Sequence, residues 1–283
     1  MPTPFDQLLH LEPAASGRLV APVAPDRSAR TYGGQFLAHT LRAAQTTVEN
    51  DRAVHSLHCY FLRAGDVDTP TELEVEHLRD GRSFSQRQVT AYQQGVEMFS
   101  TLISFHTAEQ GLAHQPEHPF DVPGPEEVTL TYHDVWEAML PPEQRPWPGR
   151  ARPMDIRYIN PPTAPEGVPI LEPQLMWMRI REPLGDDPAL HAVGLAYLAD
   201  ATLVDHVTLP HGFRWQDERL TGASLDHAMW FHQSCRADEW LLYDQRVEFT
   251  GGARGLASGR FYTADGTLVA TCMQEGLMRW ADA

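Results

Sequence analysis

Lysine is absent from this chain of 283 residues, and its 22 basic residues are all arginine. Without a lysine amine, Schiff-base catalysis and the lysine-containing phosphate loop are both excluded. Acidic residues number 38, so the formal net charge is −16. This excess of one sign argues against nucleic acid or an anionic membrane as a partner, and any phosphate-bearing substrate must be held locally by arginine.

Cysteine is scarce as well, and Cys59, Cys235 and Cys272 lie far apart in the chain. Their spacing suits neither a metal site nor a disulfide framework, so we expect reduced thiols in a cytoplasmic protein. No run approaches the roughly 20 uninterrupted apolar residues of a membrane helix, and residues 1–30 lack the basic start and apolar core of a secretory signal. With 42% apolar residues, the chain can nevertheless fill a globular core.

The chain contains an internal repeat. Residues 81–105 align with residues 252–276 at a constant offset, with glycines in matching places, and Ile103 falls on Gln274. Two copies this far apart indicate duplicated domains rather than a solenoid. We expect an N-terminal unit at residues 1–107, a proline-rich linker with a short helix at 108–150, and a C-terminal unit at 151–283 that carries the catalytic residues.

Hydrophobic periodicity predicts similar elements in both units. Apolar residues at helical spacing predict a helix over residues 35–48, and Asp187 followed by Pro188 is typical of the start of a second helix, expected to run to about Val204. One long helix against a curved antiparallel sheet, made twice, is the α+β architecture called the double hotdog. Strands are expected at residues 54–63, 71–78, 83–92, 96–106, 173–181, 225–231, 239–249, 255–262 and 267–280, and a linker helix at 127–140.

Three polar residues of the second unit come from separate predicted elements. Asp200 lies on the helix, Ser224 enters a strand and Gln274 belongs to the last strand. Hydrolysis by an activated water needs a base and further polar groups that hold the water for attack. Each residue alone has a plainer interpretation, because a helical Asp is usually solvated or capping, Ser can cap a turn and Gln can face outward. Spacing alone does not bring the three together.

Histidines offer a competing base but no metal site. His58 lies on a strand of the first unit, and His accepts protons near neutral pH. His206 with His211, and His227 with His232, are spaced in a way that suits neither one helix face nor one side of a strand. No Gly-x-Ser-x-Gly or Gly-x-Gly-x-x-Gly motif occurs, which leaves serine hydrolase and nucleotide-cofactor chemistry unsupported.

Segments of both units, in matching order, carry a family resemblance. In the first unit they are Tyr32-Gly33-Gly34-Gln35, His55 to Asp66 and Leu78 to Ser85. In the second unit they are Tyr197-Leu198-Ala199-Asp200, Leu225 to His232, Glu239 to Tyr243 and Gln274 to Arg279. These segments resemble the type II acyl-CoA thioesterase family, the bacterial TesB-like enzymes, over nearly the whole chain outside the linker.

The resemblance implies hydrolysis of fatty acyl-CoA to free fatty acid and CoA, with no metal, no cofactor and no covalent acyl-enzyme. It assigns the catalytic aspartate to Asp200, the water-holding glutamine to Gln274, and the hydroxyl residue to Ser224, where many members carry Thr. Backbone N–H groups of Gly33 and Gly34, near a helix start, are candidates for polarising the thioester carbonyl. Because hotdog sheets commonly associate, we also expect a homo-oligomer, either a dimer or a tetramer.

Two other functions stay open from the sequence. A hotdog enoyl-CoA hydratase or dehydratase needs Asp and His five residues apart on the helix. Asp200 and His206 are six apart, which turns the His away from the partner face. A non-catalytic acyl-CoA-binding protein is the second alternative, although such a protein does not need a water-activating trio. Acyl chain length and the arginines that meet the CoA phosphates are not readable from the sequence.

Overall fold

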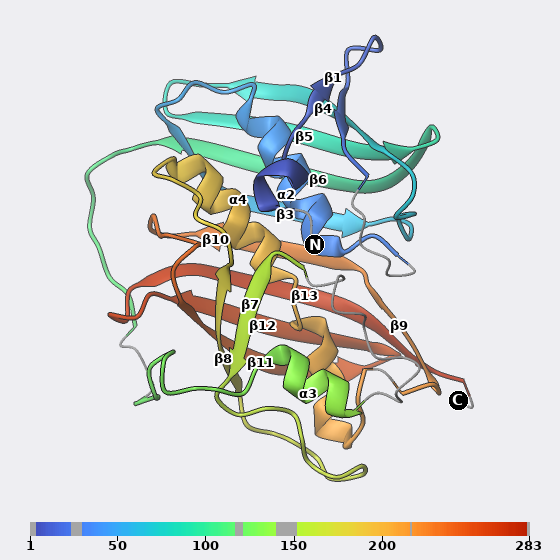
Figure 1. Cartoon of the computed structure of the whole chain (residues 1–283). Helices are drawn as coiled ribbons and strands as arrows, with labels where there is room; N and C mark the ends of the chain where they lie inside the picture. Colours follow the sequence, from blue (N-terminus) through green and yellow to red (C-terminus); the bar gives the residue numbers. More distant parts are fainter. Residues whose placement is uncertain (1–3, 24–29, 117–120, 140–151, 216, 282–283) are drawn as a thin grey trace.

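The first half of the chain folds into one long helix and a set of antiparallel strands. The computed structural model describes residues 4–23, 30–116, 121–139, 152–215 and 217–281 (Figure 1). Gln94 and Gly95 adopt positive φ values of 51° and 77°, as a tight two-residue hairpin turn requires, so the predicted hairpin is confirmed. The elements are α1 (Phe5–Leu8), β1 (Glu12–Pro13), β2 (Leu19–Ala21), α2 (Gly33–Gln45), β3 (Arg52–Phe61), β4 (Thr71–Asp80), β5 (Phe84–Gln93) and β6 (Val96–Thr107).

The second half repeats this order of two strands, a long helix and a run of antiparallel strands, which number four in the first half and five in the second. The predicted strands are confirmed with slightly shifted ends, and two short strands, β7 and β9, were not predicted. The elements are α3 (Tyr132–Met139), β7 (Met154–Tyr158), β8 (Gln174–Ile180), α4 (Pro188–Ala199), the 3₁₀ helix η2 (Val204–His211), β9 (Leu220–Ser224), β10 (Asp226–Phe231), β11 (Leu241–Gly251), β12 (Arg254–Tyr262) and β13 (Leu268–Trp280).

The predicted end of the second helix at Val204 is wrong. The Asp187 side chain caps the start as expected, accepting a hydrogen bond from the backbone N of Ala189. The helix then ends at Ala199, because Thr202 adopts a φ of 65°, which no α-helix accommodates. Gln245 stabilises this break by donating from Nε2 to the Ala201 carbonyl at 3.1 Å. Asp200 is therefore the C-cap of α4 rather than a residue within a longer helix.

The linker helix starts later than predicted. It begins at Tyr132 rather than Glu127, because Thr131 and Asp134 cap it reciprocally. The Thr131 N–H donates to Oδ2 of Asp134 at 2.9 Å, and the Asp134 N–H donates to Oγ1 of Thr131 at 3.2 Å. The prolines that close the predicted linker, at positions 141, 142, 146 and 148, lie outside the described residues.

A continuous antiparallel sheet joins the two halves. Among the described residues its strand order is β1-β2-β4-β5-β6-β3-β10-β13-β12-β11-β8-β7, with β9 paired to β13. At the seam, β3 and β10 pair around His58↔Ala228, and Leu57↔Met229 is matched by Cys59↔His227 on the other side. An approximate two-fold axis therefore passes between His58 and Ala228 and relates the two halves.

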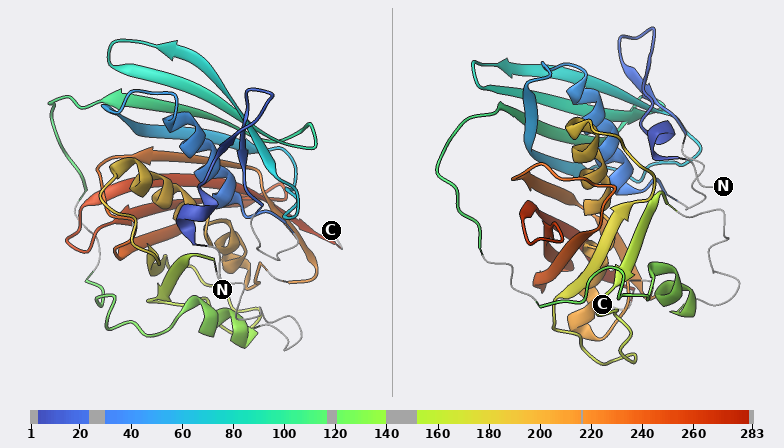
Figure 2. Two further views of the ribbon diagram at one scale, coloured as in Figure 1. Left: turned by 45° about the horizontal axis from the view of Figure 1, so that its top comes forward. Right: turned by 60° about the vertical axis from the view of Figure 1, so that its left-hand side comes forward.

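Both long helices lie on one face of this sheet. Figure 2 shows α2 and α4 side by side across the seam, and the two helices contact each other. Buried side chains of both halves form one cluster between helices and sheet. The helical run Pro188–His211 has the length and mean hydropathy, 1.2, of a membrane span, but 83% of its most apolar window is buried inside the protein. That burial is typical of a core helix.

Candidate active site

The three residues predicted from the second half meet in one cluster. The Gln274 carboxamide donates from Nε2 to Oδ1 of Asp200 at 2.7 Å and to Oγ of Ser224 at 2.9 Å. Gln274 is fully buried, Asp200 is 9% exposed and Ser224 is half-buried. The amide thus bridges a carboxylate and a hydroxyl at the inner face of the sheet.

The first half contributes to the same cluster. The backbone N–H of Gly34, in the first turn of α2, donates to Oδ2 of Asp200 at 2.8 Å. A Cβ at Gly33 would lie 2.7 Å from Oδ2 of Asp200, and one at Gly34 would lie 2.4 Å from the Tyr197 carbonyl oxygen. Only glycine allows this approach of the two helices. Because Gly34 serves the carboxylate, its N–H is not available to a thioester carbonyl as the sequence had suggested.

Side chains from both halves hold the C-terminal end of α4. Tyr32, the N-cap of α2, donates its hydroxyl to the Tyr197 carbonyl at 2.8 Å. Tyr243 donates its hydroxyl to the Ala199 carbonyl at 2.7 Å. The last carbonyls of a helix have no partner within the helix. These bonds supply partners and fix the position of Asp200.

A β-bulge brings Ser224 into the site. β10 pairs with β13 at Ala228↔Met273, whereas β9 pairs with it at Ser224↔Gly276. Residues 225–227 therefore face only Gln274 and Glu275, which is one residue too many for regular pairing. In a regular strand, residues three apart point to opposite faces. The extra residue turns Ser224 and His227 toward the same face, and the hydrophobic pattern contains no signal of this bulge.

His227 and Cys59 are buried beside the trio. His227 is 1% exposed, and burial lowers its pKa to about 4. Cys59 donates from Sγ to the His227 carbonyl at 3.2 Å. Burial, with the nearby Asp200 charge, raises the pKa of Cys59 well above its ordinary value, so the group stays a thiol and offers no nucleophile. From the sequence, His227 had only been weighed as a metal ligand, with a spacing to His232 that does not suit one.

The carboxylate of Asp200 sits in an environment that makes it a better base. Burial raises the pKa of Asp200 to about 6, opposed by the Gln274 hydrogen bond, the positive charge of Arg152 and the Gly34 N–H. Arg152 stacks its guanidinium over the Tyr32 ring, 3.8 Å from the centroid. Burial also raises the pKa of Asp205 to about 7. A base with a pKa close to the working pH combines ionisation with proton affinity. Neither Arg152 nor Asp205 was singled out by the sequence.

The competing histidines lie elsewhere. His58 is exposed on the outer face of β3, with its ring edge against Trp230 at a centroid distance of 5.2 Å. His206 is buried in η2, where burial lowers its pKa to about 3. His211 and His232 each contact a threonine hydroxyl, at 2.9 Å. Within the described ranges, no three His, Cys, Asp or Glu side chains gather into a group suited to a metal.

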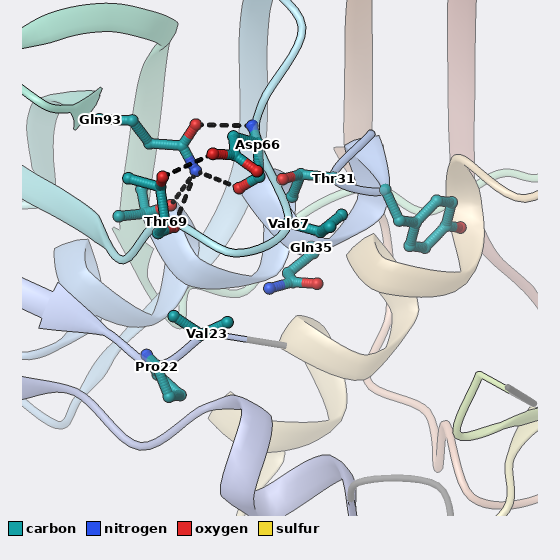
Figure 3. A pocket seen from close by; sticks show the side chains of 10 residues that line it. Pro22, Val23, Thr31, Gln35, Asp66, Val67, Thr69 and Gln93 are labelled. Carbon is teal, nitrogen blue, oxygen red and sulfur yellow. Dashed lines mark hydrogen bonds between the residues drawn. The ribbon is translucent and has the colours of Figure 1, made fainter. Parts of the chain in front are cut away.

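A small pocket next to Tyr32 is separate from the trio. Figure 3 shows it between the start of α2 and the loop that follows β3, with Thr31, Gln35 and Gln93 among its lining residues. The Gln93 carboxamide accepts from the Asp66 N–H at 2.8 Å and donates to the Asp66 carbonyl at 2.9 Å. These bonds from Gln93 hold the loop in place.

Comparison with known proteins identifies the family. The family model described as "Acyl-CoA thioesterase" matches residues 166–277, and "Acyl-CoA thioesterase N-terminal domain" matches residues 21–106. Acyl-coenzyme A thioesterase 8 of Mus musculus is 39% identical over 263 residues, covering 89% of this chain and 81% of that protein.

Solved structures agree with this assignment. Acyl-CoA thioesterase II TesB2 from Mycobacterium marinum aligns with a TM-score of 0.79 and 39% identity, over 97% of this chain and 98% of that chain. A hot dog fold protein of unknown function from Alicyclobacillus acidocaldarius aligns with a TM-score of 0.78 and 21% identity over 97% of each chain, which supports the fold alone. The chain belongs to the type II acyl-CoA thioesterase family, has the double hotdog fold and is a thioester hydrolase.

Proposed function

We propose that the protein hydrolyses fatty acyl-CoA to free fatty acid and CoA, using a water molecule activated by Asp200 and held by Ser224 and Gln274. The observation that carries this proposal is the bridge made by the Gln274 carboxamide, from Oδ1 of Asp200 to Oγ of Ser224. A carboxylate with a raised pKa, an amide and a hydroxyl in one buried cluster are the groups that water activation requires.

Each group has a separate task in this mechanism. Asp200 accepts a proton from water as the water oxygen forms a bond to the thioester carbonyl carbon. Ser224 accepts a bond from Gln274, which leaves its own O–H to orient the water or the substrate oxygen. The tetrahedral intermediate then breaks its C–S bond, and Asp200 returns the proton to the CoA thiolate. One water is consumed, and one acid and one thiol are released.

The hydratase alternative finds little support in this arrangement. Both oxygens of Asp200 are engaged, by Gln274 and by Gly34, and neither by a histidine. His206, the nearest candidate in sequence, belongs to η2 rather than to the helix that ends at Asp200. A buried ring whose pKa is lowered to about 3 is a poor proton donor and acceptor near neutral pH.

The experiment is release of free thiol from acyl-CoAs of short, medium and long chain, with mass spectrometry of the products. We expect the native protein to release CoA and Asp200→Asn to lose at least about 10²-fold in kcat, the effect typical of removing a general base. His58→Gln, on the outer face, is the matched control and should retain the native rate. Intact acyl-CoA with every chain length would leave the binding protein as the better reading, and a product heavier by one water would indicate a hydratase.

A further inference from the structure

His227 and Gln274 are two buried side chains whose hydrogen-bonding capacity is partly unused. His227 is 1% exposed and Gln274 is fully buried. Within the part of the chain that the structure describes, both ring nitrogens of His227 and Oε1 of Gln274 have no hydrogen-bond partner, and all three atoms are shielded from solvent. An unpaired buried polar atom costs about 1–3 kcal/mol. A rearrangement that pairs these atoms with each other would remove this cost.

The bulge between β9 and β10 sets the two side chains next to each other. Regular pairing of β10 with β13 stops at Ala228↔Met273, and His227 and Gln274 are the next residues on the two strands. Opposing side chains of antiparallel strands have Cβ atoms about 4.5–5.5 Å apart. Burial lowers the pKa of His227, and the neighbouring Gln274 carboxamide opposes this, although no ring nitrogen of His227 meets hydrogen-bond geometry with Gln274.

The other half of the molecule replaces both residues together. The two-fold axis at the seam relates His227 to Leu57, and Leu57 pairs with Ile103, the counterpart of Gln274. Leu57 and Ile103 are 1% and 2% exposed. The half without the glutamine therefore also lacks the histidine, and an apolar pair fills the same place. Paired exchange is what a hydrogen bond between buried groups predicts, because either polar group alone would be left unpaired.

We propose that His227 is a positioning residue for the hydrolysis proposed above: a small rotation lets its neutral ring donate a hydrogen bond to Oε1 of Gln274, which fixes the carboxamide with Nε2 toward Asp200 and Ser224. Without that bond the carboxamide can turn over. A reversed carboxamide would bring Oε1 against the Asp200 carboxylate, and two acceptors repel each other. The water-holding bridge would then be lost without any change in Asp200 itself.

A double-mutant cycle tests whether His227 acts through Gln274. We expect His227→Leu, which copies the first half, to lower kcat at least about tenfold with KM nearly unchanged, because geometry and not substrate binding is disturbed. His227→Asn retains an N–H donor and should recover much of the loss. In a Gln274→Ala background, His227→Leu should cause no further loss. An unchanged kcat for His227→Leu, or an equal further loss in the Gln274→Ala background, would overturn the proposal.

A control and a measurement without turnover complete the test. Met229→Leu changes a buried residue of the same strand outside the site and should retain the native kcat. Nitrogen-15 NMR of the native protein should show one His227 ring N–H protected from exchange, and Gln274→Ala should release it. Free exchange in the native protein would refute the hydrogen bond. If CoA is never released yet this N–H is protected, the hydrolysis proposal fails and the positioning contact stands.

Discussion

Matching positions in the two halves of the sheet carry different side chains. β3 pairs with β6 much as β9 and β10 pair with β13. Both of these strand pairings contain a bulge, which in the first half lies between Val54 and Ser56. The second half is polar at these positions, and the first half is mostly apolar. The counterparts are Thr46 for Asp200 as the helix C-cap, Val54 for Ser224, Leu57 for His227 and Ile103 for Gln274.

The first half also closes the end of its helix with a cation. Arg87 lies opposite Ile103 in the sheet, where the second half has Ala257 opposite Gln274. Arg87 is 1% exposed and donates to the Thr47 carbonyl at 2.9 Å and to Oδ1 of Asp80 at 2.8 Å. A positive charge at a helix C-terminus is stabilising. The same place in the fold unit thus holds a buried cation in one half and a buried alanine opposite Gln274 in the other.

At the helix N-termini the second half has the capped helix, and the first half has the helix without a side-chain cap. α4 is capped by its own Asp187, and Pro188 has no N–H to offer. α2 follows Tyr32, which makes no side-chain cap, so the Gly34 N–H reaches Asp200 instead. One half provides the open helix N-terminus and the other provides the carboxylate at the helix C-terminus. The duplicated units are therefore complementary, and the cluster around Asp200 contains groups from both.

Converting the second half toward the first should have the largest effect. Gln274→Ile installs the counterpart residue and removes the donor to both Asp200 and Ser224. We expect kcat to fall at least about 10²-fold, because the water loses its fixed position. Ile103→Val is the matched change in the first half and should cost about 0.5–1.5 kcal/mol of stability without lowering kcat. Equal kinetic losses from both variants would contradict the division of roles.

The pH profile gives the next largest effect. The carboxyl of Asp200 must be ionised to accept a proton, and burial raises its pKa to about 6. We expect kcat/KM to fall about tenfold per pH unit below that value and to level off above it. Asp80, in the first half, has its pKa lowered to about 2 by Ser85 and Arg87 and would give no such titration. A midpoint near the ordinary aspartate value in a profile from pH 4 to 8 would refute the assignment.

The sequence predicted the long strands of both halves but not the short strands β1, β2, β7 and β9, because alternation and turn residues are local signals that need several residues to show. It missed the end of α4 at Ala199, which depends on Thr202 being held by Gln245 from a distant strand. It named Asp200 and Gln274 by resemblance, but the contact between them joins residues 74 positions apart. The position of His227 beside Gln274 was not predicted, because it follows from a one-residue bulge that leaves no mark in the hydrophobic pattern.

Arg87 allows the structural role of the first half to be tested by itself. Arg87→Met removes the cap of α2 and leaves the Thr47 carbonyl without this donor. We expect the free energy of unfolding to fall by about 1–3 kcal/mol, the cost of an unsatisfied buried polar group. Denaturant unfolding measures this change, and kcat at a temperature where the variant is folded should stay near the native value. A large loss of kcat in the folded variant would mean that the first half contributes more to the site than Gly34 and Tyr32.

Ser224 offers the finest distinction, because its counterpart Val54 has the same branching that threonine would restore. Ser224→Thr keeps the hydroxyl that accepts from Gln274 at 2.9 Å and adds a methyl group that restricts χ1. We expect kcat to change by less than about threefold, with any change upward, because the hydroxyl spends more time in one rotamer. Ser224→Ala, which lacks the hydroxyl, should lose clearly more. If kcat falls equally in Ser224→Thr and Ser224→Ala, the half-buried site cannot hold the extra methyl group. The small size of serine would then matter as well as its hydroxyl.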